Sequence, residues 1–212
     1  MTYSNSGKKR SCPEPDFIGS IQDNCVDTQS RIIYVHSDFE PDESGVDFRM
    51  ATRFIKNLDY LNNLSSRPIT LKMFSCGGCW NYGMSIYDAI ASSKSPITCI
   101  SYAYASSMSS IIPQAAANRY ISKHCDFMIH YGTYEDSGDF RQVANGLKFS
   151  EKQNNVMLDL YAAKCVNGPY FKERNMNKNK TRQFIKNKIE KLTDWWMTSE
   201  ESVFYGFMDK VI

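Results

Sequence analysis

The stretch Tyr102-Ala-Tyr-Ala-Ser-Ser-Met-Ser-Ser110 follows a short apolar run at 96–101 and leads into a segment rich in small residues. We expect the apolar run to form a strand and residues 107 to about 117 to form a helix packed tightly under a sheet. In open α/β sheets, functional groups gather at the carboxyl ends of the strands. The stretch therefore places Ser107 where such a fold collects its chemistry.

Strands and helices are predicted to alternate along most of the chain. Short apolar runs indicate strands, and apolar residues three and four positions apart indicate helices. The predicted strands cover 31–36, 68–74, 96–101, 118–121, 126–131 and 208–212, and the predicted helices cover 45–63, 82–92, 107–117, 139–165 and a short segment that Thr198-Ser-Glu-Glu201 opens as a capping box. This alternation favours parallel βαβ units and thus the α/β class.

After Gly138 the sequence predicts a long helix and then a basic segment, in place of short alternating strands and helices. Residues 139–165 predict one long helix, which Asn167-Gly168 would end. The next segment, 172–191, is rich in Lys, Arg and Asn, and Phe184 is its only aromatic residue. Because nucleic-acid surfaces interleave aromatic with basic residues, we interpret this segment as a solvated helix and loop.

The length and composition of the chain limit the classes of protein to which it can belong. A chain of 212 residues suits one domain, and Lys+Arg 25 against Asp+Glu 23 gives no argument for a nucleic-acid or membrane partner. No apolar run approaches the roughly 20 residues that span a bilayer. The polar, basic stretch 1–15 lacks the apolar middle of a secretory signal. An odd count of seven cysteines then suggests reduced thiols and a cytoplasmic location.

Cys76-Gly-Gly-Cys79 resembles half of a metal or redox site. A structural metal site usually needs a second pair of ligands, and the chain has only His36, His124 and His130 as histidines. We therefore favour ordinary thiols and predict no metal and no cofactor. The chain also has no G-x-x-x-x-G-K-[ST] phosphate-binding loop.

Three residues of the chain suit nucleophilic catalysis. A serine attacks a carbonyl efficiently only when an imidazole takes its proton and a carboxylate orients that imidazole. Ser107, His130 and Asp194 could fill these roles. Taken singly, each also suits an ordinary role as a helix cap or small packed residue, a strand histidine, or a surface carboxylate.

Five segments, in order and roughly in register from Arg31 to Ile212, resemble the ClpP family of serine peptidase subunits. They are Phe74-Ser-Cys-Gly-Gly78 for the family's Asn-Ser-Pro-Gly-Gly, Gly83-Met-Ser-Ile-Tyr-Asp88 for Gly-x-x-Ile-Tyr-Asp, Ala105-Ser-Ser-Met108 for Ala-Ala-Ser-Met, Phe127-Met-Ile-His130 for Met-Ile-His, and Asp194-Trp-Trp-Met-Thr-Ser-Glu-Glu201 with Tyr205-Gly206 and Asp209 for the closing segment. One such match would be a weak signal, whereas five in register are specific.

The resemblance assigns a role to each residue of the site. Ser107 becomes the nucleophile because Met108 follows it, His130 the general base and then acid, and Asp194 the group that orients the imidazole. Backbone N–H groups of Gly77 and Met108 become the oxyanion hole. A Gly-Gly turn permits close approach of the backbone, and the first turn of a helix offers unpaired N–H groups.

The resemblance also implies an architecture. We expect a ClpP/crotonase-like spiral of βαβ units over 31–212, with a protruding handle helix at about 138–168 and a Lys/Asn-rich insertion at about 172–191. Residues 1–30 form a divergent N-terminal segment. The family implies a homo-oligomer, a heptameric ring that stacks into a double ring, fed with unfolded polypeptides by a AAA+ unfoldase.

The implied function is a serine endopeptidase that cleaves unfolded chains at apolar side chains through an acyl-enzyme. The chain departs from the family pattern at Cys76 (usually Pro), Ala103 (usually Gly) and Thr193 (usually an Arg that helps join two rings). The alternatives are a phage-type maturation protease of the same fold and a catalytically silent ring subunit. A crotonase acting on acyl-CoA thioesters fits less well, because it would not need a complete triad.

Overall fold

The computed structural model describes residues 15–36 and 45–212. Its strands are β1 (Val26–Asp27), β2 (Ile32–His36), β3 (Ile69–Ser75), β4 (Ile97–Ser106), β5 (Asn118–Ile121), β6 (Asp126–Ile129), β7 (Trp195–Met197) and β8 (Lys210–Val211). Its helices are α1 (Pro15–Asn24), α2 (Phe48–Leu64), α3 (Trp80–Ala91), α4 (Met108–Ile111), which a 3-10 turn continues over Ile112–Ala115, α5 (Phe140–Cys165), α6 (Pro169–Glu173), α7 (Lys178–Leu192) and α8 (Ser199–Phe204). The fold is α/β, as the sequence predicts.

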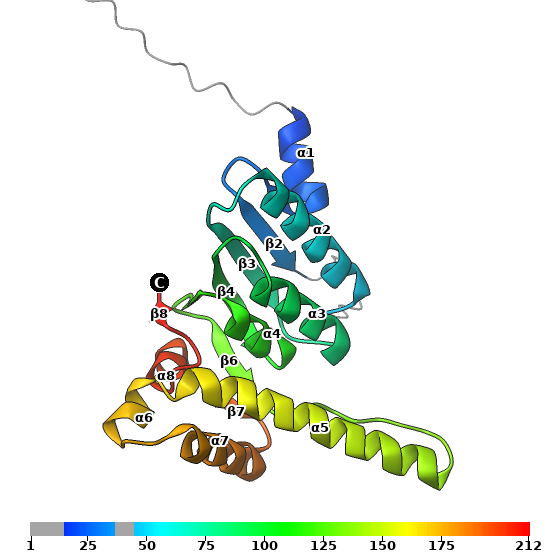
Figure 1. Cartoon of the computed structure of the whole chain (residues 1–212), viewed down its shortest axis with the longest axis vertical. Helices are drawn as coiled ribbons and strands as arrows, with labels where there is room; N and C mark the ends of the chain where they lie inside the picture. Colours follow the sequence, from blue (N-terminus) through cyan, green and yellow to red (C-terminus); the bar gives the residue numbers. More distant parts are fainter. Residues whose placement is uncertain (1–14, 37–44) are drawn as a thin grey trace, which may run out of the picture.

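The sheet is mostly parallel. Its order is β1-β2-β3-β4-β5-β8, and only β1 pairs antiparallel in that path. Helices α2, α3 and α4 lie against one side of the strands, and α5 extends away from this body (Figure 1). The expected spiral with a protruding handle helix is therefore the observed architecture.

Strand β4 has two successive partners, and this positions the site. Its first half pairs with β5, and its second half pairs with β6 in parallel, with Ser106 opposite Met128. Strand β6 in turn pairs antiparallel with β7, with Ile129 opposite Trp195. The residues that immediately follow β4, follow β6 and precede β7 are therefore neighbours at one end of the sheet.

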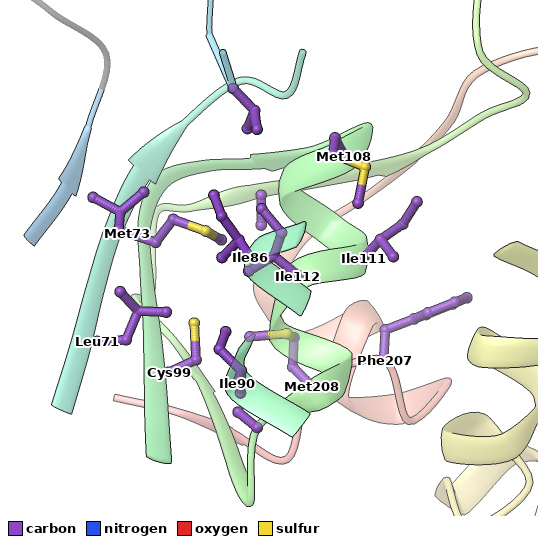
Figure 2. Packing of buried hydrophobic residues seen from close by; sticks show 14 of the residues in the cluster. Leu71, Met73, Ile86, Ile90, Cys99, Met108, Ile111, Ile112, Phe207 and Met208 are labelled. Carbon is purple, nitrogen blue, oxygen red and sulfur yellow. The ribbon is translucent and has the colours of Figure 1, made fainter. Parts of the chain in front are cut away.

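The core lies between the sheet and its covering helices. Strand β3 alternates buried and less buried side chains, as a strand with one face on the core must. Leu71 and Met73 of this strand meet Ile86 and Ile90 of α3 in a single buried cluster (Figure 2). Ile86 and Ile90 are the buried apolar side chains of α3, whereas Met84 and Tyr87 are only partly buried against the cluster.

Several predicted boundaries differ from the structure. The strand at 96–101 continues to Ser106, and the helix at 107–117 gives way after Ile111 to a 3-10 turn that contains Pro113. The strand at 208–212 shortens to β8. The short elements α1, β1, α6 and β7 were not predicted from the sequence. Of the divergent segment 1–30, residues 1–14 lie outside the described residues.

Most of the Lys/Asn-rich segment 172–191 lies in α7, a helix that is largely exposed, as predicted, but that also has a buried face. Its side chains Thr181, Ile185 and Ile189 are buried, four residues apart, on the face that meets α5. Arg182 binds Asp159 of α5 at 2.6 Å, which links the two helices at their surface. The buried face was not predicted, because the lysines and asparagines outnumber the few apolar residues that form it.

Helix α5 is anchored at one end only. Asp139 caps its start in a capping box with Gln142, and its buried residues lie in its last third. Earlier positions such as Phe140 (87% exposed) and Phe149 (59% exposed) present apolar side chains to solvent. No helix within 15–36 and 45–212 is long and apolar enough to cross a membrane.

Candidate active site

Ser107, His130 and Asp194 meet at the end of the sheet that β4, β6 and β7 share. The Ser107 Oγ and the His130 Nε2 lie 2.8 Å apart, and the His130 Nδ1 and the Asp194 Oδ1 lie 3.1 Å apart. Both separations are hydrogen-bond distances. With Nδ1 donating to the carboxylate, Nε2 is the acceptor for the serine proton, which is the arrangement of a Ser-His-Asp triad.

The backbone of Ser107 is held in an unusual conformation. Its φ of 53° and ψ of −127° are rarely adopted by any residue except glycine. The Ser107 N–H donates to the Met128 carbonyl at 2.9 Å, and the Ser107 carbonyl accepts from the N–H and the hydroxyl of Ser110 at 3.0 and 2.5 Å. These bonds fix a sharp strand-to-helix turn that presents the Ser107 hydroxyl to the imidazole.

The neighbouring serines are placed differently. The Oγ atoms of Ser106 and Ser109 are buried, and neither has a hydrogen-bond partner among the described residues. Ser110 is turned toward the Ser107 carbonyl and the Tyr161 hydroxyl. Of the four serines in this stretch, Ser107 is the one in contact with His130.

Asp194 is positioned by the end of α7. Thr193 adopts a φ of 63°, unusual for a β-branched residue, while its N–H still donates to the Ile189 carbonyl at 2.8 Å. The Asp194 N–H then donates to the Leu192 carbonyl at 2.8 Å. This tight turn reverses the chain into β7. The Asp194 side chain is 47% exposed and that of His130 is 21% exposed, so the outer part of the triad faces solvent.

A glycine turn lies against the serine. Gly77 and Gly78 have φ values of 114° and 146°, and a Cβ atom on Gly77 would stand 2.6 Å from the Ser107 Cβ. The Gly77 carbonyl accepts from the Val46 N–H at 2.6 Å, and its N–H donates to the Ser75 hydroxyl at 3.3 Å. Only glycine allows the backbone to come this close to the nucleophile.

A cavity of about 390 Å³ opens beside Ser107. Residues from the start of α3, from α4, from the segment after His130 and from α5 enclose it. They are Gly78, Cys79, Trp80, Ser107, Met108, Ile111, His130, Gly132, Thr133, Tyr134, Ser150, Gln153, Asn154 and Met157. The handle helix therefore contributes one wall of the site, which no feature of the sequence had indicated.

The remaining sequence-derived candidates can be placed as well. Met108 is the first residue of α4, where helical N–H groups have no partner within the helix. Cys76 and Cys79 are both exposed free thiols at the glycine turn. Among the described residues, no group of three or more His, Cys, Asp or Glu side chains is arranged to hold a metal ion.

Comparison with known proteins shows to which family the chain belongs. A family model described as Clp protease matches residues 28–212. The chain belongs to the Clp protease family. The ATP-dependent Clp protease proteolytic subunit 1 of Protochlamydia amoebophila is 29% identical over 174 residues, which cover 79% of this chain and 76% of that protein. Subunit 3 of a Synechococcus species is 28% identical, with coverage of 80% and 79%.

A solved member of the Clp protease family shares the fold. A mutant ClpP1 from Listeria monocytogenes superposes with a TM-score of 0.66 over 87% of this chain and 92% of that chain, at 19% identity. These modest identities make the chain a divergent member. The resemblance predicted from the five segments is thereby confirmed at the level of family and fold, while the roles of the individual site residues remain predictions.

Proposed function

We propose that this chain is the proteolytic subunit of a Clp-type protease and that it hydrolyses peptide bonds of unfolded proteins as a serine endopeptidase. The observation that carries the proposal is the continuous hydrogen-bond chain from Ser107 through His130 to Asp194. The strained backbone of Ser107 supports it, since strain of this kind clusters at functional sites.

The proposed reaction begins with acylation. The Ser107 Oγ attacks the scissile carbonyl carbon while its proton passes to the His130 Nε2, and Asp194 stabilises the imidazolium that forms. When the tetrahedral intermediate collapses, the carbon–nitrogen bond breaks and His130 gives the proton to the leaving amine. Water then attacks the acyl ester, His130 takes a proton from it, and that proton returns to the Ser107 Oγ as the carboxylic acid leaves.

Charge on the tetrahedral oxygen needs donors already in place. The Met108 N–H at the start of α4 and the Gly77 N–H are the proposed pair. The bond from Gly77 to the Ser75 hydroxyl is long at 3.3 Å, so a full negative charge would compete well for that N–H. Loss of one such donor typically lowers kcat by about 10²–10³.

The proposed assembly is a homo-oligomeric heptameric ring, single or stacked as a double ring, that works in the cytoplasm with a AAA+ unfoldase. The curated relatives support a partner ATPase, because they are named as proteolytic subunits of ATP-dependent proteases. The exposed apolar side chains of α5, which include Phe140, Leu147 and Phe149, support a partner surface along the handle. Native mass spectrometry should give about 170 kDa for one ring of the 24.3 kDa chain, or twice that mass for a double ring.

A peptidase assay tests the catalytic proposal. The Ser107→Ala variant should lose about 10³-fold or more in kcat/KM on a fluorogenic peptide, because it removes the nucleophile. Ser106→Ala is the matched control, since the Ser106 hydroxyl is buried without a partner among the described residues and its loss breaks no bond. The proposal fails if Ser107→Ala retains wild-type activity. An assembled wild type without activity on any peptide would favour the silent ring subunit instead.

The carboxylate is tested separately. Asp194→Asn keeps the shape of the side chain but removes its charge, and we expect kcat to fall by about 10²–10⁴. The binding of substrate should change little, so KM should stay within a factor of a few. Unchanged kcat would show that the half-exposed carboxylate does not orient His130.

A further inference from the structure

The cavity beside Ser107 has an apolar floor. Met108, Ile111 and Met157 line it, and each is no more than 3% exposed. Figure 2 shows Met108 and Ile111 on the same side of α4. A floor of this kind gives favourable contact to the methylene groups of a substrate side chain.

The part of the lining that α5 contributes before Met157 is polar. Ser150, Gln153 and Asn154 of α5 line the cavity, and their spacing of three and four residues places them on one face of the helix. Each is partly buried, and none has a hydrogen-bond partner for its side chain within residues 15–36 and 45–212. The wall therefore offers amide donors, amide acceptors and a hydroxyl that the protein itself leaves unused.

The cavity lining carries no fixed charge. Among the described residues that line it, none is Asp, Glu, Lys or Arg. A charged side chain entering this space would lose hydration without gaining an opposite charge, which is costly. An aliphatic side chain would avoid that cost but would cover the amides of Gln153 and Asn154 without bonding them.

The segment after His130 packs against the helix that carries the polar wall. Tyr134 lies over the handle where α5 has a glycine, since a Cβ atom on Gly146 would stand 1.6 Å from the Tyr134 hydroxyl oxygen. The Tyr134 hydroxyl donates to Asp136 at 2.5 Å. Tyr134 therefore lies against α5 at Gly146, and its bond to Asp136 holds the tyrosine within its own loop beside the cavity.

We propose that this cavity is the pocket for the substrate side chain that precedes the cleaved bond, and that it selects glutamine. The proposal rests on the proposed function, because it assigns the residue to be cut by Ser107. A glutamine side chain has two methylene groups to lie on the floor and an amide that matches the donors and acceptors of Gln153 and Asn154. This differs from the cleavage at apolar side chains that the family resemblance implies.

A kinetic series tests the selection. Fluorogenic peptides of one sequence, with Gln, Leu, Glu or Lys before the cleaved bond, should give the wild type a kcat/KM at least about tenfold higher for Gln than for the others. The Gln153→Leu/Asn154→Leu variant should reverse the order of Gln and Leu. Asn145→Leu is the matched control, because it is an exposed amide on the same helix that does not line the cavity.

A binding series separates this proposal from the proposed function. The Ser107→Ala protein should bind an acetylated tripeptide amide that ends in Gln at least about tenfold more tightly than the Leu or Glu peptide, measured by calorimetry. Preference for Gln in binding with no cleavage by the wild type would sustain the pocket and contradict the peptidase. Equal or tighter binding of the Leu peptide would overturn the selection of glutamine, whether or not the wild type cleaves it. This series needs no folded double variant.

Discussion

A buried pair of hydroxyl groups links the handle helix to the proposed nucleophile. The Tyr161 hydroxyl of α5 and the Ser110 Oγ lie 2.6 Å apart, and the Ser110 hydroxyl donates to the Ser107 carbonyl at 2.5 Å. Ser110 therefore accepts from Tyr161. Burial raises the pKa of Tyr161, so its hydroxyl keeps the proton that this bond requires.

The two single substitutions should have unequal costs. Ser110→Ala leaves the Tyr161 hydroxyl buried without a partner, which we expect to lower the free energy of unfolding by about 2 kcal/mol. Tyr161→Phe leaves Ser110 still bonded to the Ser107 carbonyl and should cost about 1 kcal/mol. The double variant has no orphaned hydroxyl and should cost about 1 kcal/mol, well below the sum of the single effects.

Urea unfolding of the four proteins, at one protein concentration, measures this coupling. We expect a coupling free energy of about 2 kcal/mol and a lower kcat for both variants that lack Ser110, because the Ser107 turn loses a bond. Ser109→Ala is the matched control, since the Ser109 hydroxyl is buried without a partner among the described residues. Single effects that add to within about 0.5 kcal/mol would refute the reasoning.

Three further outcomes follow from the structure. Asp209→Ala removes the carboxylate that binds the Arg119 guanidinium. Because Arg119 is only 8% exposed, its charge would be left buried without this partner, and the free energy of unfolding should fall by about 3 kcal/mol. An unchanged urea midpoint would contradict this prediction. Ala103→Gly should raise the free energy of unfolding by about 0.5 kcal/mol, because a φ of 58° is strained for alanine but not for glycine. The greater freedom of glycine in the unfolded chain offsets only part of this gain. A lower melting temperature of the variant would argue against strain at Ala103. Iodoacetamide at pH 8 should label the exposed Cys76 and leave Cys99 unlabelled until the protein is unfolded. Burial raises the pKa of Cys99 to about 12, so little of its thiol is ionised at pH 8. Labelling of Cys99 in the folded protein, detected by peptide mass spectrometry, would contradict this prediction.

The parts of the fold that local periodicity specifies could be predicted from sequence. The apolar run at 68–74 and the helical spacing along α2 predicted a strand and a helix, and the order of such elements along the chain predicted a parallel sheet. Ser107 follows the apolar run at 96–101 and precedes a predicted helix, so it was expected at the edge where a parallel sheet gathers the carboxyl ends of its strands. These inferences needed only neighbours in the sequence.

Features that depend on distant contacts could not be predicted. Strand β7 has three residues, and it is a strand only because β6 supplies its partner. The continuation of β4 past residue 101 includes Ala103 in a left-handed conformation, which no local pattern favours for alanine. The polar wall of the cavity consists of Ser150, Gln153 and Asn154, and their spacing alone does not distinguish a lining face from a solvated one.

The central claim is that Ser107 is an activated nucleophile. Labelling with a fluorophosphonate, followed by mass spectrometry of the modified peptide, measures this directly, because the probe reacts with serines whose proton a base removes. We predict one adduct, on Ser107, that disappears in Ser107→Ala and slows by at least about 10² in His130→Ala. Absence of an adduct on the folded wild-type protein, or an equal rate without His130, would contradict the account.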